Sequence, residues 1–211
     1  MRRAAAALAL VCAIWAGAAG AAPHGRYAPR DECTADPAVV KFRSALADAV
    51  ARRDAMLIVQ LAEPDIGLDF GGGAGREEFV ARLQGTGEGS WADLAEVLRL
   101  GCALEGDRLT LPWLFAQHAF ADPYASLVVT GERVALRAAP RTTSRALARL
   151  DWEGVEIVGG YEPDKRFQHV RWGKRSGWIA TRYLRSVIGY RLIAVREPGG
   201  PFRIAMFIAG D

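Results

Sequence analysis

The spacing of apolar residues changes at Asp122-Pro123, and this change constrains the fold of the chain more than any other feature. Before this point, apolar residues recur at intervals of three and four, which is the period of an α-helix. Beyond it, apolar runs are short and are separated by Gly, Pro, Asp and Ser, as in antiparallel β-structure. The sequence therefore predicts an α+β domain before Asp122, with helices packed on a small antiparallel sheet, and an all-β unit after it.

Capping residues and apolar stripes predict four helices in the first domain. The first begins at Pro37, because Asp36 is a favourable N-cap and proline suits the first helical position. Its apolar stripe consists of Val39, Phe42, Leu46, Ala49 and Val50. The other helices are expected over residues 55–61 after the N-cap Asp54, over residues 76–83, and from Ser90, which forms a capping-box pair with Asp93.

The helices of the first domain need a sheet to cover, and extended segments are scarce before Asp122. Residues 66–70 and 109–112 are the two candidates. Residues 190–195 and 202–208 flank a Pro-Gly-Gly-Pro turn and have the pattern of a hairpin. This hairpin must bury its apolar side, so we expect it to complete the sheet of the first domain. The alternative is that it extends an edge of the β unit.

The predicted organisation is an α+β domain interrupted by an inserted β unit. The expected boundaries are 1–22 for a signal peptide, 33–123 for the α+β domain, 126–187 for the β unit and 188–211 for the hairpin that completes the first domain.

The runs after Pro123 fit a small barrel of roughly 60 residues. The expected interior consists of alternate residues of these runs: Val134, Leu136, Leu147, Leu150, Val155, Ile157, Val170 and Ile179. Arg137, Glu156 and Arg171 then face outward.

Two motifs in the β unit resemble the bacterial SH3 family. Residues 134–140, Val-Ala-Leu-Arg-Ala-Ala-Pro, resemble the opening Val-Asn-Leu-Arg-x-x-Pro of that family, with Ala135 where many members have Asn. Residues 170–179 and the Tyr-Leu pair at 183–184 resemble its closing motif. The resemblance covers about a quarter of the chain. It implies an SH3-like barrel that targets the cell wall or packs within an envelope protein.

The β unit also carries the candidate ligand-binding residues. Its aromatic side chains could form a groove for an extended peptide, although Phe167 and Trp178 are expected in the core of so small a barrel. Arginine and lysine are frequent here, and a basic face attracts anionic polymers or lipid head groups. The alternative is an ordinary solvated surface. The candidate ligand-binding residues are Tyr161, Trp172, Arg137 and Arg171.

Residues 1–22 have the pattern of a secretory signal peptide. Arg2 and Arg3 precede an apolar run that ends near Trp15, and small residues follow. The run is shorter than the roughly 20 residues of a membrane-spanning helix, so we expect a periplasmic or secreted protein with no membrane span. Without Arg2 and Arg3 the chain has 25 basic and 24 acidic residues, a balance that argues against nucleic acid as a partner.

The two cysteines beyond the signal peptide, Cys33 and Cys102, are expected to form a disulfide; the alternative is two separate thiols. The chain contains no Cys-x-x-Cys or His-x-x-x-His spacing, so neither a metal nor a cofactor is expected. A cell-wall hydrolase is the rival class, but its only Cys/His candidates are Cys102 with His118 or His169. We therefore expect a non-catalytic envelope protein whose partner is peptidoglycan or, alternatively, an envelope protein.

Overall fold

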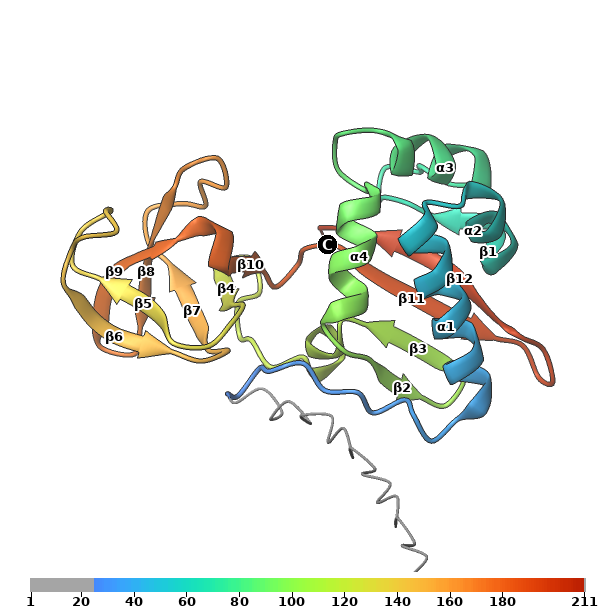
Figure 1. Ribbon diagram of the computed structural model, residues 1–211, viewed down its shortest axis with the longest axis horizontal. Helices are drawn as coiled ribbons and strands as arrows, with labels where there is room; N and C mark the ends of the chain where they lie inside the picture. The colour runs from blue at the N-terminus through green and yellow to red at the C-terminus, as the bar shows by residue number, and fades with distance from the viewer. Residues whose placement is uncertain (1–24, 211) are drawn as a thin grey trace, which may run out of the picture.

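The computed structural model describes residues 25–210, which form two units that lie side by side (Figure 1). We call residues 31–118 and 188–210 the helix–sheet unit, and residues 122–187 the β unit. The expected signal peptide lies outside the described residues. Within residues 25–210, no helix has both the length and the apolar character needed to cross a membrane.

The helix–sheet unit contains the helices α1 Pro37–Arg52, α2 Ala55–Leu61, α3 Arg76–Gln84 and α4 Trp91–Arg99. Local chemistry sets their first residues. Asp36 and Asp54 accept hydrogen bonds from N–H groups in the first turns of α1 and α2. Ser90 and Asp93 form the predicted capping box at α4. All four helices lie where the sequence predicts them, to within one residue at each predicted end.

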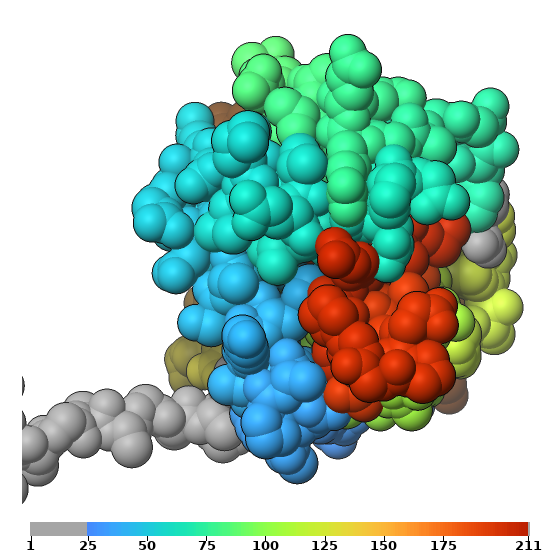
Figure 2. Space-filling model, turned by 90° about the vertical axis from the view of Figure 1, so that its right-hand side faces the viewer, coloured from blue at the N-terminus to red at the C-terminus, as the bar shows by residue number. Residues whose placement is uncertain are grey.

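These helices cover one face of a five-stranded sheet with the order β1-β12-β11-β3-β2 (Figure 1). The strands are β1 Ala62–Gly67, β2 Ala103–Glu105, β3 Arg108–Leu111, β11 Arg191–Arg196 and β12 Phe202–Ile208. The β11–β12 hairpin lies at the centre of the sheet, between β3 and β1. In Figure 2 the end of the hairpin, in red, lies against the blue N-terminal segment, where Arg196 forms ion pairs with Asp36 and Asp107.

Two details of this sheet differ from the sequence prediction. The strand expected over residues 66–70 is displaced to β1, and Phe70 lies exposed in the turn that follows. In addition, β1 runs parallel to β12, so the sheet is not wholly antiparallel. The reason is tertiary, because Ala62 pairs with Ile204 from the far end of the chain, and this pairing overrides the local pattern.

One hydrophobic core lies between the helices and the five-stranded sheet. The stripe of α1 supplies Val39, Phe42, Leu46 and Ala49, all buried, and the sheet supplies Leu109, Leu111, Leu192, Ile204 and Phe207. Burying one large apolar side chain stabilises a fold by about 1.5–3 kcal/mol.

A disulfide joins Cys33 and Cys102 inside this core. The two Cα atoms lie 6.1 Å apart, and both side chains are fully buried. Cys33 precedes α1 and Cys102 follows α4, so the bond ties together the two ends of the helical layer. Neither sulfur is a free thiol in this structure.

The β unit is an antiparallel sheet of seven strands with the order β10-β4-β7-β8-β9-β5-β6. The strands are β4 Ser126–Val129, β5 Val134–Arg137, β6 Ala146–Leu150, β7 Gly154–Ile157, β8 Phe167–Trp172, β9 Arg175–Ala180 and β10 Leu184–Ser186. Every strand contributes to a single core, so the sheet curls around it. Six of the eight predicted interior residues are buried there, and Leu147 and Ile157 pack against it while partly exposed. Within the described residues β6 and β10 are edge strands that do not pair with each other.

A third cluster of buried side chains joins the two units. Its buried members are Tyr27, Ala103, Trp113, Leu114 and Val128. Beside it, Arg185 of β10 is only 9% exposed and forms an ion pair with Glu96 of α4, at 2.9 Å between Nη1 and Oε2. Burial lowers the pKa of the Arg185 guanidinium, and the carboxylates of Glu96 and Asp93 oppose this effect. The joint is therefore both apolar and ionic.

Candidate functional site

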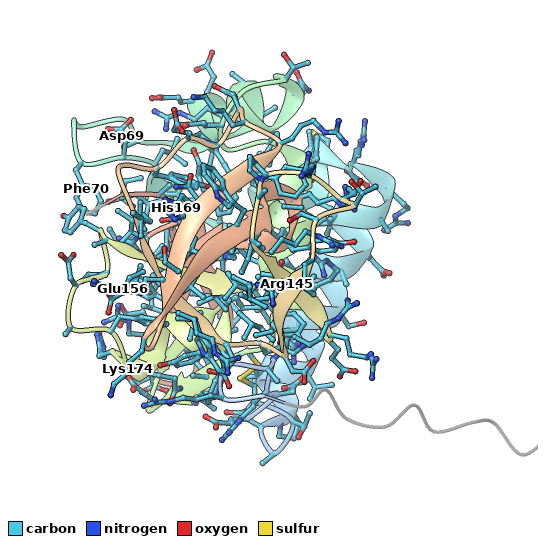
Figure 3. All side chains as sticks on the ribbon, turned by 90° about the vertical axis from the view of Figure 1, so that its left-hand side faces the viewer. Asp69, Phe70, Arg145, Glu156, His169 and Lys174 are labelled. Carbon is cyan, nitrogen blue, oxygen red and sulfur yellow. A yellow bond between two sulfur atoms is a disulfide. The ribbon has the colours of Figure 1, made fainter. Side chains whose placement is uncertain are left out.

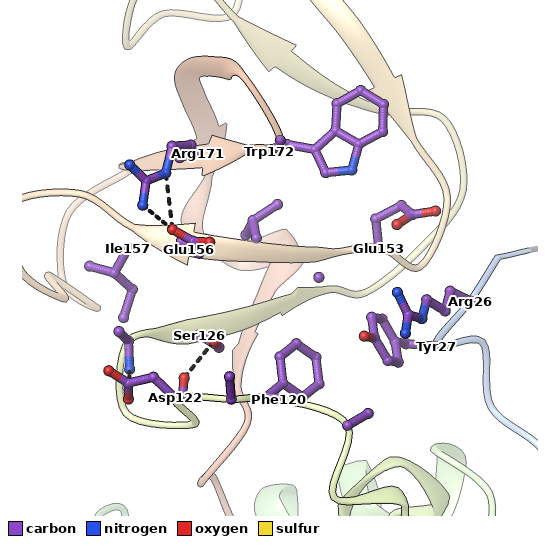
Figure 4. Close-up of a pocket in the computed structure, with 16 residues that line it drawn as sticks. Arg26, Tyr27, Phe120, Asp122, Ser126, Glu153, Glu156, Ile157, Arg171 and Trp172 are labelled. Carbon is purple, nitrogen blue, oxygen red and sulfur yellow. Dashed lines mark hydrogen bonds and ion pairs between the residues drawn. The ribbon is translucent and has the colours of Figure 1, made fainter.

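A groove of about 650 Å³ on the β unit is lined by residues of strands β7 and β8 and of two irregular segments (Figure 4). One segment precedes α1, and the other follows the 3₁₀-helix η1, Trp113–Gln117. Three aromatic side chains line the groove: Tyr27, Phe120 and Trp172. Charged residues of both signs surround them: Arg26, Asp122, Glu153, Glu156 and Arg171. The groove thus combines an aromatic wall with a mixed polar rim, the usual composition of a small binding site.

The β7–β8 pair positions one side of the groove. Trp172 is the last residue of β8, and its partly buried ring packs against the core of the β unit. Arg171 lies opposite Glu156 of β7, and its Nε donates to a Glu156 carboxylate oxygen at 2.9 Å. Both side chains are 57% exposed, so this ion pair contributes less than about 1 kcal/mol to stability. Its main effect is to fix the polar edge beside Trp172.

The irregular segments form the opposite side. The rings of Tyr27 and Phe120 lie with centroids 4.7 Å apart, tilted by 31°, and Arg26 lies over the Tyr27 ring at 5.3 Å. Gly154 of β7 makes this arrangement possible, because a Cβ atom there would lie 2.8 Å from the Phe120 ring. Nearby, Asp122 accepts a hydrogen bond through its carbonyl oxygen from the Ser126 hydroxyl at 2.6 Å, which fixes the turn into β4.

The structure separates the four candidate ligand-binding residues. Trp172 and Arg171 both line the groove. Arg137 lies in a different hollow, at the β5–β6 side of the unit. Tyr161 is 41% exposed on the loop between β7 and β8, and it lines a third, shallow depression. Partial burial raises the pKa of the Tyr161 phenol, and the charge of Arg185 at the joint opposes this effect. The four residues therefore do not form one site.

Sequence reasoning missed Tyr27, Phe120 and Glu153, which complete the groove. Tyr27 and Phe120 are single aromatic residues in irregular segments, far apart in the chain, and no local pattern marks them. Gly154 is the one position with a usable signal, since a glycine at the start of a strand often marks the close approach of another group.

The other aromatic residues of the β unit are dispersed, and its basic residues do not form one continuous face. Phe167 is buried as expected, whereas Trp178 is only half-buried and stacks on His169 at 4.7 Å between centroids. The expected basic face is interrupted, because Arg185 is buried in the joint and Arg145 and Lys174 lie well apart (Figure 3).

The residues that the sequence offered for metal binding or nucleophilic attack lie outside the groove. In the described residues, one cluster has the composition of a metal site, namely Asp31, Cys33 and Cys102, but the two sulfur atoms are bonded to each other. For the same reason Cys102 is not a thiolate nucleophile in this structure. No protein-family model, curated protein or solved structure matches the chain.

Proposed function

We propose that this is a non-catalytic protein of the cell envelope, exported to the periplasm or beyond, and that its groove binds an extended segment of the cell wall. The observation that carries the proposal is the aromatic wall of Tyr27, Phe120 and Trp172 beside exposed charges of both signs. Peptidoglycan presents apolar sugar faces together with carboxylate and amine groups, which match these two kinds of surface. The resemblance of residues 134–184 to bacterial SH3 domains supports the same class of ligand.

The arrangement of the groove also supports positioning of a ligand between the two units. Tyr27 belongs to the segment that leads into the helix–sheet unit, and it packs in the cluster at the joint. A polymer held between Tyr27 and Trp172 would therefore lie at a fixed orientation to both units. Such a protein would present its helix–sheet unit at a constant distance from the wall.

Co-sedimentation of the purified protein with peptidoglycan sacculi, at low and moderate salt, tests this proposal. We expect the wild-type protein to pellet at both salt concentrations and Trp172→Ala to bind about tenfold more weakly or worse, as for the loss of a central aromatic contact. Trp178→Ala is the matched control, because Trp178 is also half-buried in the β8–β9 hairpin but does not line the groove. Circular dichroism would verify that both variants fold.

The other outcomes are equally informative. Equal loss of pelleting with salt in all three proteins would contradict an aromatic groove and indicate binding through arginine side chains. No pelleting of the wild-type protein would reject wall binding and leave an envelope protein as the partner.

A further inference from the structure

The second hollow of the β unit has a different chemistry from the groove and shares no lining residue with it. Its volume is about 290 Å³. Four arginine side chains line it: Arg133, Arg137, Arg149 and Arg182. Glu132 is the one acidic residue of the lining. We call this the arginine hollow.

Strand geometry explains why these side chains converge. Val134 and Leu136 of β5 face the core, so Ala135 and Arg137 face the opposite side of the sheet. Arg149 of β6 lies directly across from Ala135 in the antiparallel register. Because the side chain of Ala135 ends at its Cβ atom, the space above it stays open between the longer arginine side chains, and Ala135 forms the floor of the hollow. The hollow is thus a consequence of one small residue among arginines.

Neutral partners hold three of the guanidinium groups in place. Arg137 Nη1 donates to the Ser144 carbonyl oxygen at 2.8 Å, and Arg149 Nη1 donates to the Arg133 carbonyl oxygen at 3.0 Å. Arg182 lies over the Tyr183 ring, 4.7 Å from its centroid. These contacts fix the side chains without neutralising their charge, so the remaining N–H groups are available to an acceptor.

The contrast with other arginines of the chain is informative. Arg82, Arg171, Arg185 and Arg196 each form an ion pair with a carboxylate. Within residues 25–210, none of the four arginines of the hollow does so through its side chain. The Asp151 carboxylate accepts the backbone N–H of Arg133, not its guanidinium. Positive charges that converge on one small hollow repel one another, and a bound anion would reduce this repulsion.

We propose that the arginine hollow binds a phosphate group. The planar guanidinium donates paired hydrogen bonds that match phosphate oxygens, and several arginines around a small hollow suit a compact tetrahedral anion. The hydroxyl-bearing Thr142 also lines the hollow. The phosphate group can belong to a free phosphate compound or to a lipid head group, since both present the same oxygens. This inference does not depend on the proposed wall binding.

Isothermal titration calorimetry with inorganic phosphate, against chloride at equal ionic strength, tests the proposal. We expect Arg137→Gln/Arg149→Gln to raise the Kd about tenfold or more, because the variant removes two guanidinium groups that would donate charged hydrogen bonds to the anion. Ala135→Leu should have a similar effect without any change of charge, because it fills the floor. Arg141→Gln/Arg145→Gln is the matched control, since it removes two exposed arginines of the β5–β6 connection that do not line the hollow.

Binding that is equal in all the variants, or no stronger with phosphate than with chloride, would overturn the proposal. Vesicles of phosphatidylglycerol and of phosphatidylcholine, tested by flotation with the same variants, identify the source of the phosphate. Flotation only with phosphatidylglycerol, and its loss in Ala135→Leu, would assign a lipid head group. Calorimetric binding of phosphate without flotation would assign a free phosphate compound.

Discussion

The disulfide between Cys33 and Cys102 offers the sharpest test of what stabilises the helix–sheet unit. The two residues are 69 positions apart, so the bond closes a loop that contains all four helices. In the chain-entropy model a loop of this length restricts the unfolded chain by about 4 kcal/mol at 25 °C. We therefore expect reduction of the bond to lower the free energy of unfolding by about that amount. With a urea m-value of about 2 kcal/mol/M, the midpoint would fall by about 2 M.

The variant Cys33→Ala/Cys102→Ala extends this test. Both side chains are fully buried, so the variant loses core contacts as well as the cross-link and should be less stable than the reduced wild-type protein. Urea denaturation of the oxidised, reduced and variant proteins separates the two contributions. If reduced and oxidised wild-type proteins unfold at the same urea concentration, the cross-link contributes nothing and the loop argument is refuted.

Amide hydrogen exchange locates the effect. The bond lies wholly within the helix–sheet unit, so we expect reduction to weaken protection in β11 and β12 and to leave β8 and β9 unchanged. Equal loss of protection in all four strands would show instead that the joint makes the two units unfold together.

Three further predictions concern charge and packing. Glu96→Gln leaves the buried Arg185 without its carboxylate, and we expect the free energy of unfolding in urea to fall by about 1–3 kcal/mol. This is less than for a fully buried pair, because Glu96 is one-third exposed. A double-mutant cycle with Arg185→Met that shows no coupling energy would contradict this expectation. The Arg82 guanidinium holds the pKa of the Asp69 carboxyl below its usual value of 3.8, so the stabilisation by Asp69 is complete above that pH and is lost as the pH falls through the lower, folded-state pKa. The stability gap between wild type and Asp69→Asn should therefore shrink only below about pH 3.8, and a gap that stays constant in urea titrations down to pH 2 would exclude this linkage. Gly154→Ala forces a methyl group against the Phe120 ring. We expect it to lower the free energy of unfolding, measured by thermal denaturation, by about 1–3 kcal/mol and to weaken binding to sacculi. Unchanged stability would mean that the Phe120 ring moves aside freely.

The pattern of the sequence predicted most of the secondary structure, because the decisive interactions are local. The N-caps Asp36 and Asp54 bond to N–H groups two or three residues away, so the helix starts could be read from the chain. The strand β12 lies over the predicted residues 202–208, because the apolar pattern of a strand is already visible in its own residues.

The course of β1 could not be predicted in this way. Its residues, Ala-Glu-Pro-Asp-Ile-Gly, lack the alternation of a typical strand, and they become one by pairing with β12 about 140 residues later. The same applies to the candidate site. Trp172 and Arg171 were predicted from the strand pattern, but Tyr27 and Phe120 join them only because their side chains pack against β7 at Gly154.

The sequence by itself therefore determined the helices, most strands, the change from helical to strand periodicity, the buried stripe of α1 and most of the core of the β unit. These depend on hydrogen bonds and periodicities within a few residues. Only the tertiary structure decided that Arg137 and Tyr161 lie apart from Trp172, that arginines surround Ala135, and that two remote aromatic rings complete the groove. Those arrangements depend on contacts between segments far apart in the chain, and no local pattern records such contacts.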